Sequence, residues 1–404
     1  MTDEQNWQAP GSQGAAPGGA YGQQPQYGQQ PGWQRPYPAG PQPAWTPPPK
    51  PGLIPLRPLT VGTLLAAPFQ ALRRNPRITV GAALLLQGIP SIVVSVLIAR
   101  GIALLVGRVI SGDASDQPAL RAGLIGGAIV LGVVSLVIST VFSALLQGVI
   151  VGEVARETVG DKLTFGALWR LVKGRIGALI GWTLLFALAW IVVLALVAAV
   201  VVALAMLGGP AGTIGAVSVG IIGGLGLIPL AVWINTKLSM VPSAIVLERL
   251  PLMAAVARSW RLTRGYFWRT FGIIALVAVI VYAITQTISI PFGLLGGMLG
   301  GVFAPTSATS TSTETMSQLL VTQLSVNVLA SIVTAIVGAI ASVIQTAAVS
   351  LLYIDLRMRK EGLDLELVRF VEGRQAGQDL PDPYLPGAQQ PQQPPAAAAG
   401  WPAG

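Results

Sequence analysis

The sequence predicts an all-α membrane protein, and two features of its composition carry this prediction. No charged side chain occurs between Ile176 and Thr236, a run of 61 residues. Over the whole chain, 52% of the residues are hydrophobic and only 10% are charged, whereas a soluble domain carries about 25% charged residues. Because the apolar residues form long runs, we expect them to cross a bilayer as helices.

Six apolar segments are long enough for this, since about 20 helical residues span about 30 Å of hydrocarbon. The third and the fifth are longer than needed and are expected to tilt or to protrude. The chain is therefore predicted to be a polytopic membrane protein with six spans, at residues 78–99, 122–151, 176–206, 211–235, 270–301 and 325–353.

The positions of the cations predict the orientation. Of the 25 Lys and Arg residues, all but Arg100, Arg108 and Arg121 lie before the first span, in the second and fourth connections, or after the sixth span. Basic residues stay on the cytoplasmic side of a membrane, so both termini are expected in the cytoplasm, below a bacterial plasma membrane. The net charge of +9 therefore reflects topology, and no nucleic-acid partner is expected.

The two ends of the chain differ in composition from the membrane domain, which is expected at residues 53–372. Residues 1–52 are rich in Gln, Pro and Gly, and residues 373–404 are rich in Pro, Gln and Ala. Such segments bury too little apolar surface to fold, so both are predicted to be disordered cytoplasmic tails. They act either as solvated tethers or as docking tails for cytoplasmic protein partners.

The membrane domain contains a pattern that occurs three times. A short amphipathic stretch precedes the first, third and fifth spans, and in the third copy its apolar face holds Met253, Val256, Ala257 and Trp260. Three pseudo-repeated hairpins are predicted, each preceded by an amphipathic interfacial helix that either braces the spans or recognises anionic lipids. A cation ends each stretch and an acid follows each even-numbered span, which gives a candidate cytoplasmic rim of Arg73, Lys173, Arg261, Glu153, Glu248 and Asp355.

The spans hold amides in place of charges. Proton- or ion-coupled carriers usually need a charged residue within the membrane, so the uncharged span centres argue against an energised pump. An amide facing lipid is costly, and we expect these side chains to point inward. They either form hydrogen bonds between helices or line a polar cavity or lipid-headgroup path, and the candidates are Gln87, Gln147, Gln286 and Gln345.

The chain contains no histidine and no cysteine. It therefore lacks disulfides, a thiolate nucleophile, an imidazole base and the usual protein ligands of zinc. No catalytic residue, metal site or cofactor is expected, and the enzyme interpretation is disfavoured.

Four stretches resemble a known family, the glycerophosphoryl diester phosphodiesterase membrane domain. They read PLRPL from Pro55, RRNP from Arg73, RSWRLTRGYFWR from Arg258 and LYIDLRMRKEGLD from Leu352. The resemblance covers residues 54–372 and implies the membrane architecture and an actinobacterial origin. In the phosphodiesterases that carry this module, hydrolysis belongs to a separate soluble barrel of about 250 residues that uses histidines, so no catalytic residue carries over.

These observations favour a non-catalytic membrane protein, either a scaffold or accessory subunit that recruits partners through its tails, or a passive transporter or lipid-handling protein with inward-facing amides. The scaffold interpretation leads, because the spans are uncharged and the tails are long. The composition is compatible with a monomer and with an oligomer.

Overall fold

The computed structural model of the chain describes residues 52–113, 115–302 and 313–385. The N-terminal tail, apart from residue 52, and the last part of the C-terminal tail lie outside the described residues. Within the described part the chain is helical and contains no strand. Six stretches are long and apolar enough to cross a membrane, which confirms the predicted helical class and number of spans: Pro76–Val109, Gln117–Thr158, Ile176–Met206, Gly209–Leu247, Phe267–Leu294 and Ser331–Glu361.

Proline and glycine set several of the helix boundaries. Pro76 occupies the first position of its helix, where its missing N–H is not needed, and Gly208 and Gly362 both have a φ of 68° at the turns beside their helices. The helices are α1 (Val61–Arg74), α2 (Pro76–Ala83), α3 (Ile89–Ser111), α4 (Gln117–Thr158), α5 (Phe165–Lys173), α6 (Ile176–Met206), α7 (Gly209–Leu238), α8 (Val241–Leu247), α9 (Leu252–Thr263), α10 (Phe267–Val302), α11 (Thr313–Glu361) and α12 (Leu363–Gln375).

A π-helical turn, η1 (Leu84–Gly88), interrupts the first span between α2 and α3. Pro90 lacks the N–H that a regular helix would use to bond the carbonyl of Leu86. Just before it, the Ile89 N–H donates to the Leu84 carbonyl, five residues back rather than four. Such turns are frequent at functional sites, and this one contains Gln87.

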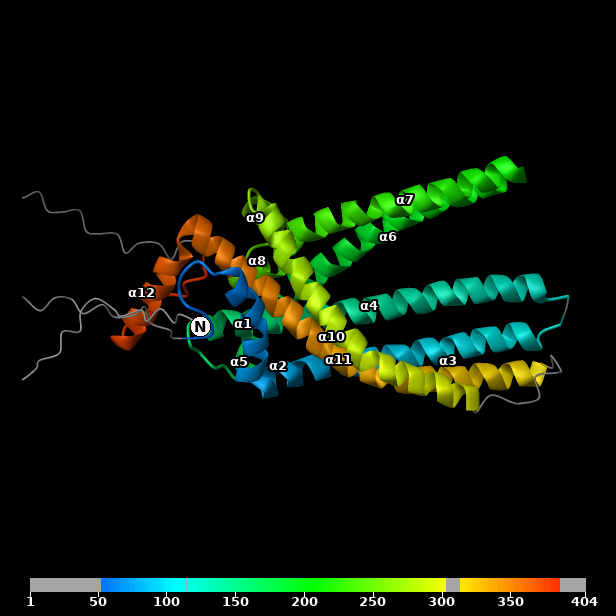
Figure 1. The fold of residues 1–404 in the computed structure, drawn as a ribbon, viewed down its shortest axis with the longest axis horizontal. Coiled ribbons are helices and arrows are strands. Elements are labelled where there is room, and N and C mark those ends of the chain that lie inside the picture. The colour runs from blue at the N-terminus through cyan, green and yellow to red at the C-terminus, as the bar shows by residue number, and fades with distance from the viewer. Residues whose placement is uncertain (1–51, 114, 303–312, 386–404) are drawn as a thin grey trace, which may run out of the picture. The chain divides into compact units, whose positions relative to one another are not determined.

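The spans pack in neighbouring pairs, α3 with α4, α6 with α7, and α10 with α11. Helix α11 also lies against α3, α4 and α1, while α6 packs on α4. Figure 1 shows α6 and α7 running alongside each other and diverging from α4. In both, none of the most apolar 18 residues is buried within the protein. The surface of this pair is therefore available to lipid.

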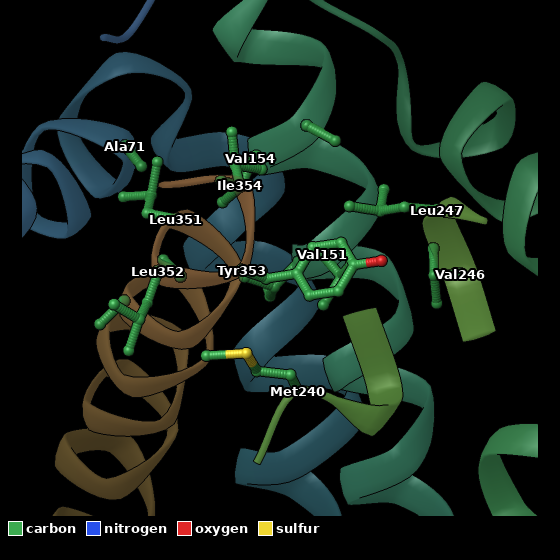
Figure 2. Packing of buried hydrophobic residues seen from close by; sticks show 14 of the residues in the cluster. Ala71, Val151, Val154, Met240, Val246, Leu247, Leu351, Leu352, Tyr353 and Ile354 are labelled. Atoms are coloured by element: carbon green, nitrogen blue, oxygen red, sulfur yellow. The ribbon is translucent and has the colours of Figure 1, made fainter. Parts of the chain in front are cut away.

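The buried core lies at one end of the spans, where α4, α8 and α11 meet. Figure 2 shows part of it, with Val151, Val154, Leu247, Leu352 and Tyr353 gathered from these three helices. Along the most apolar stretch of α11, by contrast, only 33% of the residues are buried. Tight packing is thus concentrated at the end of the bundle that also carries Glu153, Glu248 and Asp355, which we call the charged end.

Helix α4 packs closely against α5 and α6 at Gly148. A Cβ atom added there would lie 2.6 Å from Val172 Cγ1 and 2.8 Å from Leu179 Cδ1. Valine is stiff, so Gly148→Ala should cost about 1–3 kcal/mol through overpacking, more than the gain of up to about 1 kcal/mol from better helix propensity. We expect a lower midpoint of thermal unfolding in detergent.

The control is Gly126→Ala in the same helix, where an added Cβ meets no atom within 4 Å. It should leave the midpoint unchanged or raise it. If both variants behaved alike, the close approach of α4 to α5 and α6 would be wrong.

Candidate functional site

The polar side chains of the spans gather around three cavities. The central cavity, of about 450 Å³, lies among α4, α7, α8, α10 and α11 and is lined by Gln147, Asn235 and Gln345. The α6 cavity, of about 480 Å³, is lined by Gln87, Gln147 and Thr183, among others. The α3 cavity, of about 380 Å³, lies between Gln87 and Ser331. None of the described residues that line these three cavities is charged.

The three cavities adjoin one another. The central and α6 cavities share Gln147, Asn235, Ser239 and Pro242 as lining residues. Gln87 lines both the α6 cavity and the α3 cavity. Amides therefore stand at both junctions, and the three spaces form one series with an uncharged polar lining.

Several of these amides have hydrogen-bonding capacity to spare. The Gln87 Oε1 atom is buried and accepts no hydrogen bond from any described residue. Gln147 Nε2 makes a long contact of 3.5 Å with Ser143 Oγ. A buried acceptor left without a donor costs about 1–3 kcal/mol, so these groups are suited to meet water or the polar part of a ligand.

The central cavity is open at the surface of the protein. Gln345 and Asn235 line it, yet both side chains remain exposed in the structure. Val232, another lining residue, is 39% exposed. Exposed amides are costly in hydrocarbon, whereas the exposed aliphatic side chains beside them are not. An amphiphile, which has a polar and an apolar part, would therefore fit this opening better than a purely apolar chain.

Of the four glutamines that the sequence singles out, three line the cavities and one does not. Gln87, Gln147 and Gln345 do. Gln286 is exposed on α10, and its Nε2 atom lies 3.2 Å from the hydroxyl of Tyr282, one turn away. It lines none of these three cavities, and its partner is on its own helix.

Sequence reasoning did not single out the hydroxyl residues beside these amides. Ser139 and Ser143 precede Gln147 at intervals of four residues and share its face of α4. Ser91 and Ser95 follow Gln87 at the same spacing. Positions four apart lie on one helix face, so polar residues repeating every four positions in an apolar span are the signal that would have found them.

The candidate rim separates into exposed cations and buried acids. Arg73, Lys173 and Arg261 are exposed. The three acids lie inside the charged end, because each follows a span whose end packs in the core. Glu153 is 3%, Glu248 4% and Asp355 0% exposed.

Asp355 and Glu248 are paired by residues from distant parts of the chain. Asp355 accepts hydrogen bonds from the Leu59 N–H at 2.7 Å and from Arg269 and Arg359 at 3.0 Å. Glu248 accepts two bonds of 2.9 Å from Arg258. Both acids thereby tie helix ends together through charge-assisted hydrogen bonds.

Arg258 is shared between two acids, since its Nη1 atom also lies 2.6 Å from Glu361. Burial of the guanidinium lowers its pKa, but the hydrogen bonds to Glu361 and Glu248 outweigh this and raise the pKa above the ordinary value. The guanidinium of Arg258 therefore stays charged, and the Tyr353 hydroxyl donates a further hydrogen bond to Glu248.

Part of the predicted C-terminal tail is built into the same end. Tyr384 is 1% exposed, and its hydroxyl donates to the Ala155 carbonyl at 2.9 Å. Its own carbonyl accepts a 2.9 Å bond from Arg357, and Asp382 pairs with Arg156. Burial raises the pKa of Tyr384 above its ordinary value, so the hydroxyl stays protonated and keeps donating. The ordered chain thus extends beyond the expected boundary at residue 372.

Comparison with known proteins leaves the site to be interpreted from its geometry: no family model, no curated protein and no solved structure matches the chain. No group of three or more His, Cys, Asp or Glu side chains placed to hold a metal ion occurs among the described residues.

Glu248→Gln tests the paired acids. The change leaves Arg258 and Arg357, at 17% and 6% side-chain exposure, without one of their anions, and breaking such a buried pair costs about 3–5 kcal/mol. We expect a lower unfolding midpoint in detergent. Glu372→Gln on the exposed face of α12 is the control and should change the midpoint little, so equal effects would contradict the pairing.

Proposed function

We propose that the protein is a passive lipid-handling protein, whose uncharged cavities hold the polar part of a membrane lipid while its chains remain in the bilayer. One observation carries this proposal. Amides and hydroxyls from several helices line adjoining cavities of about 450 and 480 Å³, and no described lining residue is charged. These volumes fall within the range of about 300–1,000 Å³ that is typical of small-molecule sites.

The depth of the cavities supports a lipid as the occupant. Gln147 precedes Glu153 by six residues on α4, and Gln345 precedes Asp355 by ten residues on α11. At 1.5 Å per residue, these amides lie about 9 and about 15 Å along their helices from the buried acids. The central cavity is therefore within reach of a lipid in the leaflet nearest to the charged end.

The series of cavities also extends away from that end. Gln345 in the central cavity and Ser331 in the α3 cavity are both on α11, fourteen residues apart. This corresponds to about 21 Å of helix, compared with about 30 Å for the hydrocarbon core. An uncharged polar lining over such a distance suits a path for a lipid headgroup.

The finer architecture belongs to the same proposal. The pairs α3–α4, α6–α7 and α10–α11 would be three pseudo-repeated hairpins of a bacterial plasma-membrane protein with cytoplasmic termini. Helix α1 precedes the first span, α5 precedes α6, and α9 precedes α10. These three short helices would brace the hairpins at the membrane interface. In support, each buries residues on one side, such as Leu64 and Ala71 of α1 and Leu168 and Val172 of α5.

The family resemblance over residues 54–372 remains a proposal of the same kind. The scaffold interpretation depends on tails that lie largely outside the described residues, so the cavities carry the proposal instead.

Native mass spectrometry of the protein released from mild detergent tests the proposal. The parent should retain a lipid in stoichiometric amount. The double variant Gln147→Leu/Gln345→Leu removes two amides from the central cavity. Each lost hydrogen bond costs about 1 kcal/mol, so its affinity for the lipid should fall at least about tenfold, with a matching loss of retained lipid at limiting lipid concentration.

Gln286→Leu is the matched control, because this amide lines none of the described cavities and should not affect retention. A parent without a specific adduct, or equal retention by all three proteins, would rule out the central cavity as a lipid site.

A further inference from the structure

A lysine borders the central cavity. Lys237, at the end of α7, directly follows the lining residues Asn235 and Thr236. No ion pair with an acid is found for it among the described residues. Its Nζ atom instead lies 5.3 Å from the ring centre of Trp260 and 5.8 Å from that of Phe267. Both distances are within the range of cation–π contacts, about 6 Å.

Contacts with the rest of the structure hold the lysine and both rings in place. The Ser259 hydroxyl donates a 2.7 Å bond to the Lys237 carbonyl, which ties α9 to the end of α7. Phe267 stacks on Phe271, with ring centres 6.2 Å apart, and Phe271 is itself a lining residue of the central cavity. The ammonium group is therefore held next to the cavity.

Other cations stand near this position. Lys360 is close enough to Lys237 and Arg264 for their charges to interact, and Glu361 is the acid beside it. That acid is already paired with Arg258 and Arg357. The electrostatic potential around Lys237 is therefore positive and would favour an anion.

The surroundings match the interface between headgroups and hydrocarbon. Trp260 is 40% and Trp268 78% exposed, and tryptophans with exposed rings favour that level of a bilayer. An anion that reaches Lys237 from the membrane would belong to a lipid and carry acyl chains. The neutral amides of the cavity are placed to meet the uncharged polar groups next to that anion.

We propose that Lys237, whose ammonium group lies over the rings of Trp260 and Phe267, binds the phosphate of a phospholipid whose glycerol region occupies the central cavity. This rests on the proposed function and adds the class of lipid, one that carries a phosphate. Lys237 supplies the charge, and Asn235 and Gln345 supply hydrogen bonds to uncharged oxygens. A neutral diacylglycerol would use only the hydrogen bonds from Asn235 and Gln345.

The test compares two probes on the full-length protein in mild detergent, dioleoylphosphatidylglycerol and dioleoylglycerol, each titrated by native mass spectrometry. The parent should bind one phosphatidylglycerol more tightly than diacylglycerol. Lys237→Gln should weaken phosphatidylglycerol binding about fivefold, the effect of about one cation at an anionic surface, and should leave diacylglycerol binding unchanged. Lys237→Arg keeps the charge and should restore affinity.

Lys173→Gln is the matched control, because this exposed cation on α5 lines none of the three cavities described above. An equal loss in the Lys173 and Lys237 variants would overturn the proposal in favour of general attraction to the surface. Displacement of the phospholipid by millimolar inorganic phosphate would also overturn the proposal, since the site would then bind a free anion rather than a lipid.

The outcomes separate this inference from the proposed function. If both lipids bind equally and the Gln147→Leu/Gln345→Leu variant loses both, the cavity is a lipid site but Lys237 does not select phosphate. If neither lipid binds the parent, both proposals are wrong.

Discussion

Two buried acids hold the helices together at one end, and the positions of the cavities depend on them. Asp355 joins the segment before α1 to α10 and α11, through Leu59, Arg269 and Arg359. Glu248 joins the end of α8 to α9 and α11, through Arg258 and Tyr353. Lipid is as apolar as the helices it surrounds, so burial of apolar surface does not drive spans together within it. Fixed contacts at the charged end supply the constraint.

Spans that are anchored at one end are free to diverge beyond it. Helices α6 and α7 do so, and none of the most apolar 18 residues of either is buried. The polar faces of α4, α7 and α11 come together close to the anchors, before this divergence. Gln147, Asn235 and Gln345 therefore meet around a cavity, whereas Gln286 lies on a part of α10 where Tyr282 of the same helix is its partner.

The helical class and the six spans could be predicted because they follow from the length and apolarity of single segments. The glutamines are expected either to join helices or to line a cavity, and the choice between these roles could not be made from the sequence, because the positions of Gln87, Gln147 and Gln345 beside cavities depend on how the helices pack. The burial of Glu248 and Asp355 could not, since it depends on partners such as Arg258 and Arg269 that only the fold brings near. In α9, Met253 and Trp260 from the expected apolar face are exposed. Ser259 is buried instead, because its hydroxyl bonds the end of α7.

The placement of charge limits how a lipid could be moved. The buried ion pairs are confined to the charged end, and no described residue lining the three cavities titrates. Carriers coupled to a proton or ion gradient usually use charged residues within the membrane, so the uncharged lining of the described cavities suits the passive movement proposed above. Lipid movement along these cavities would run in both directions and follow the concentration difference between leaflets. Lys237 would then set which headgroups enter, and the amides would lower the cost of passing them through hydrocarbon.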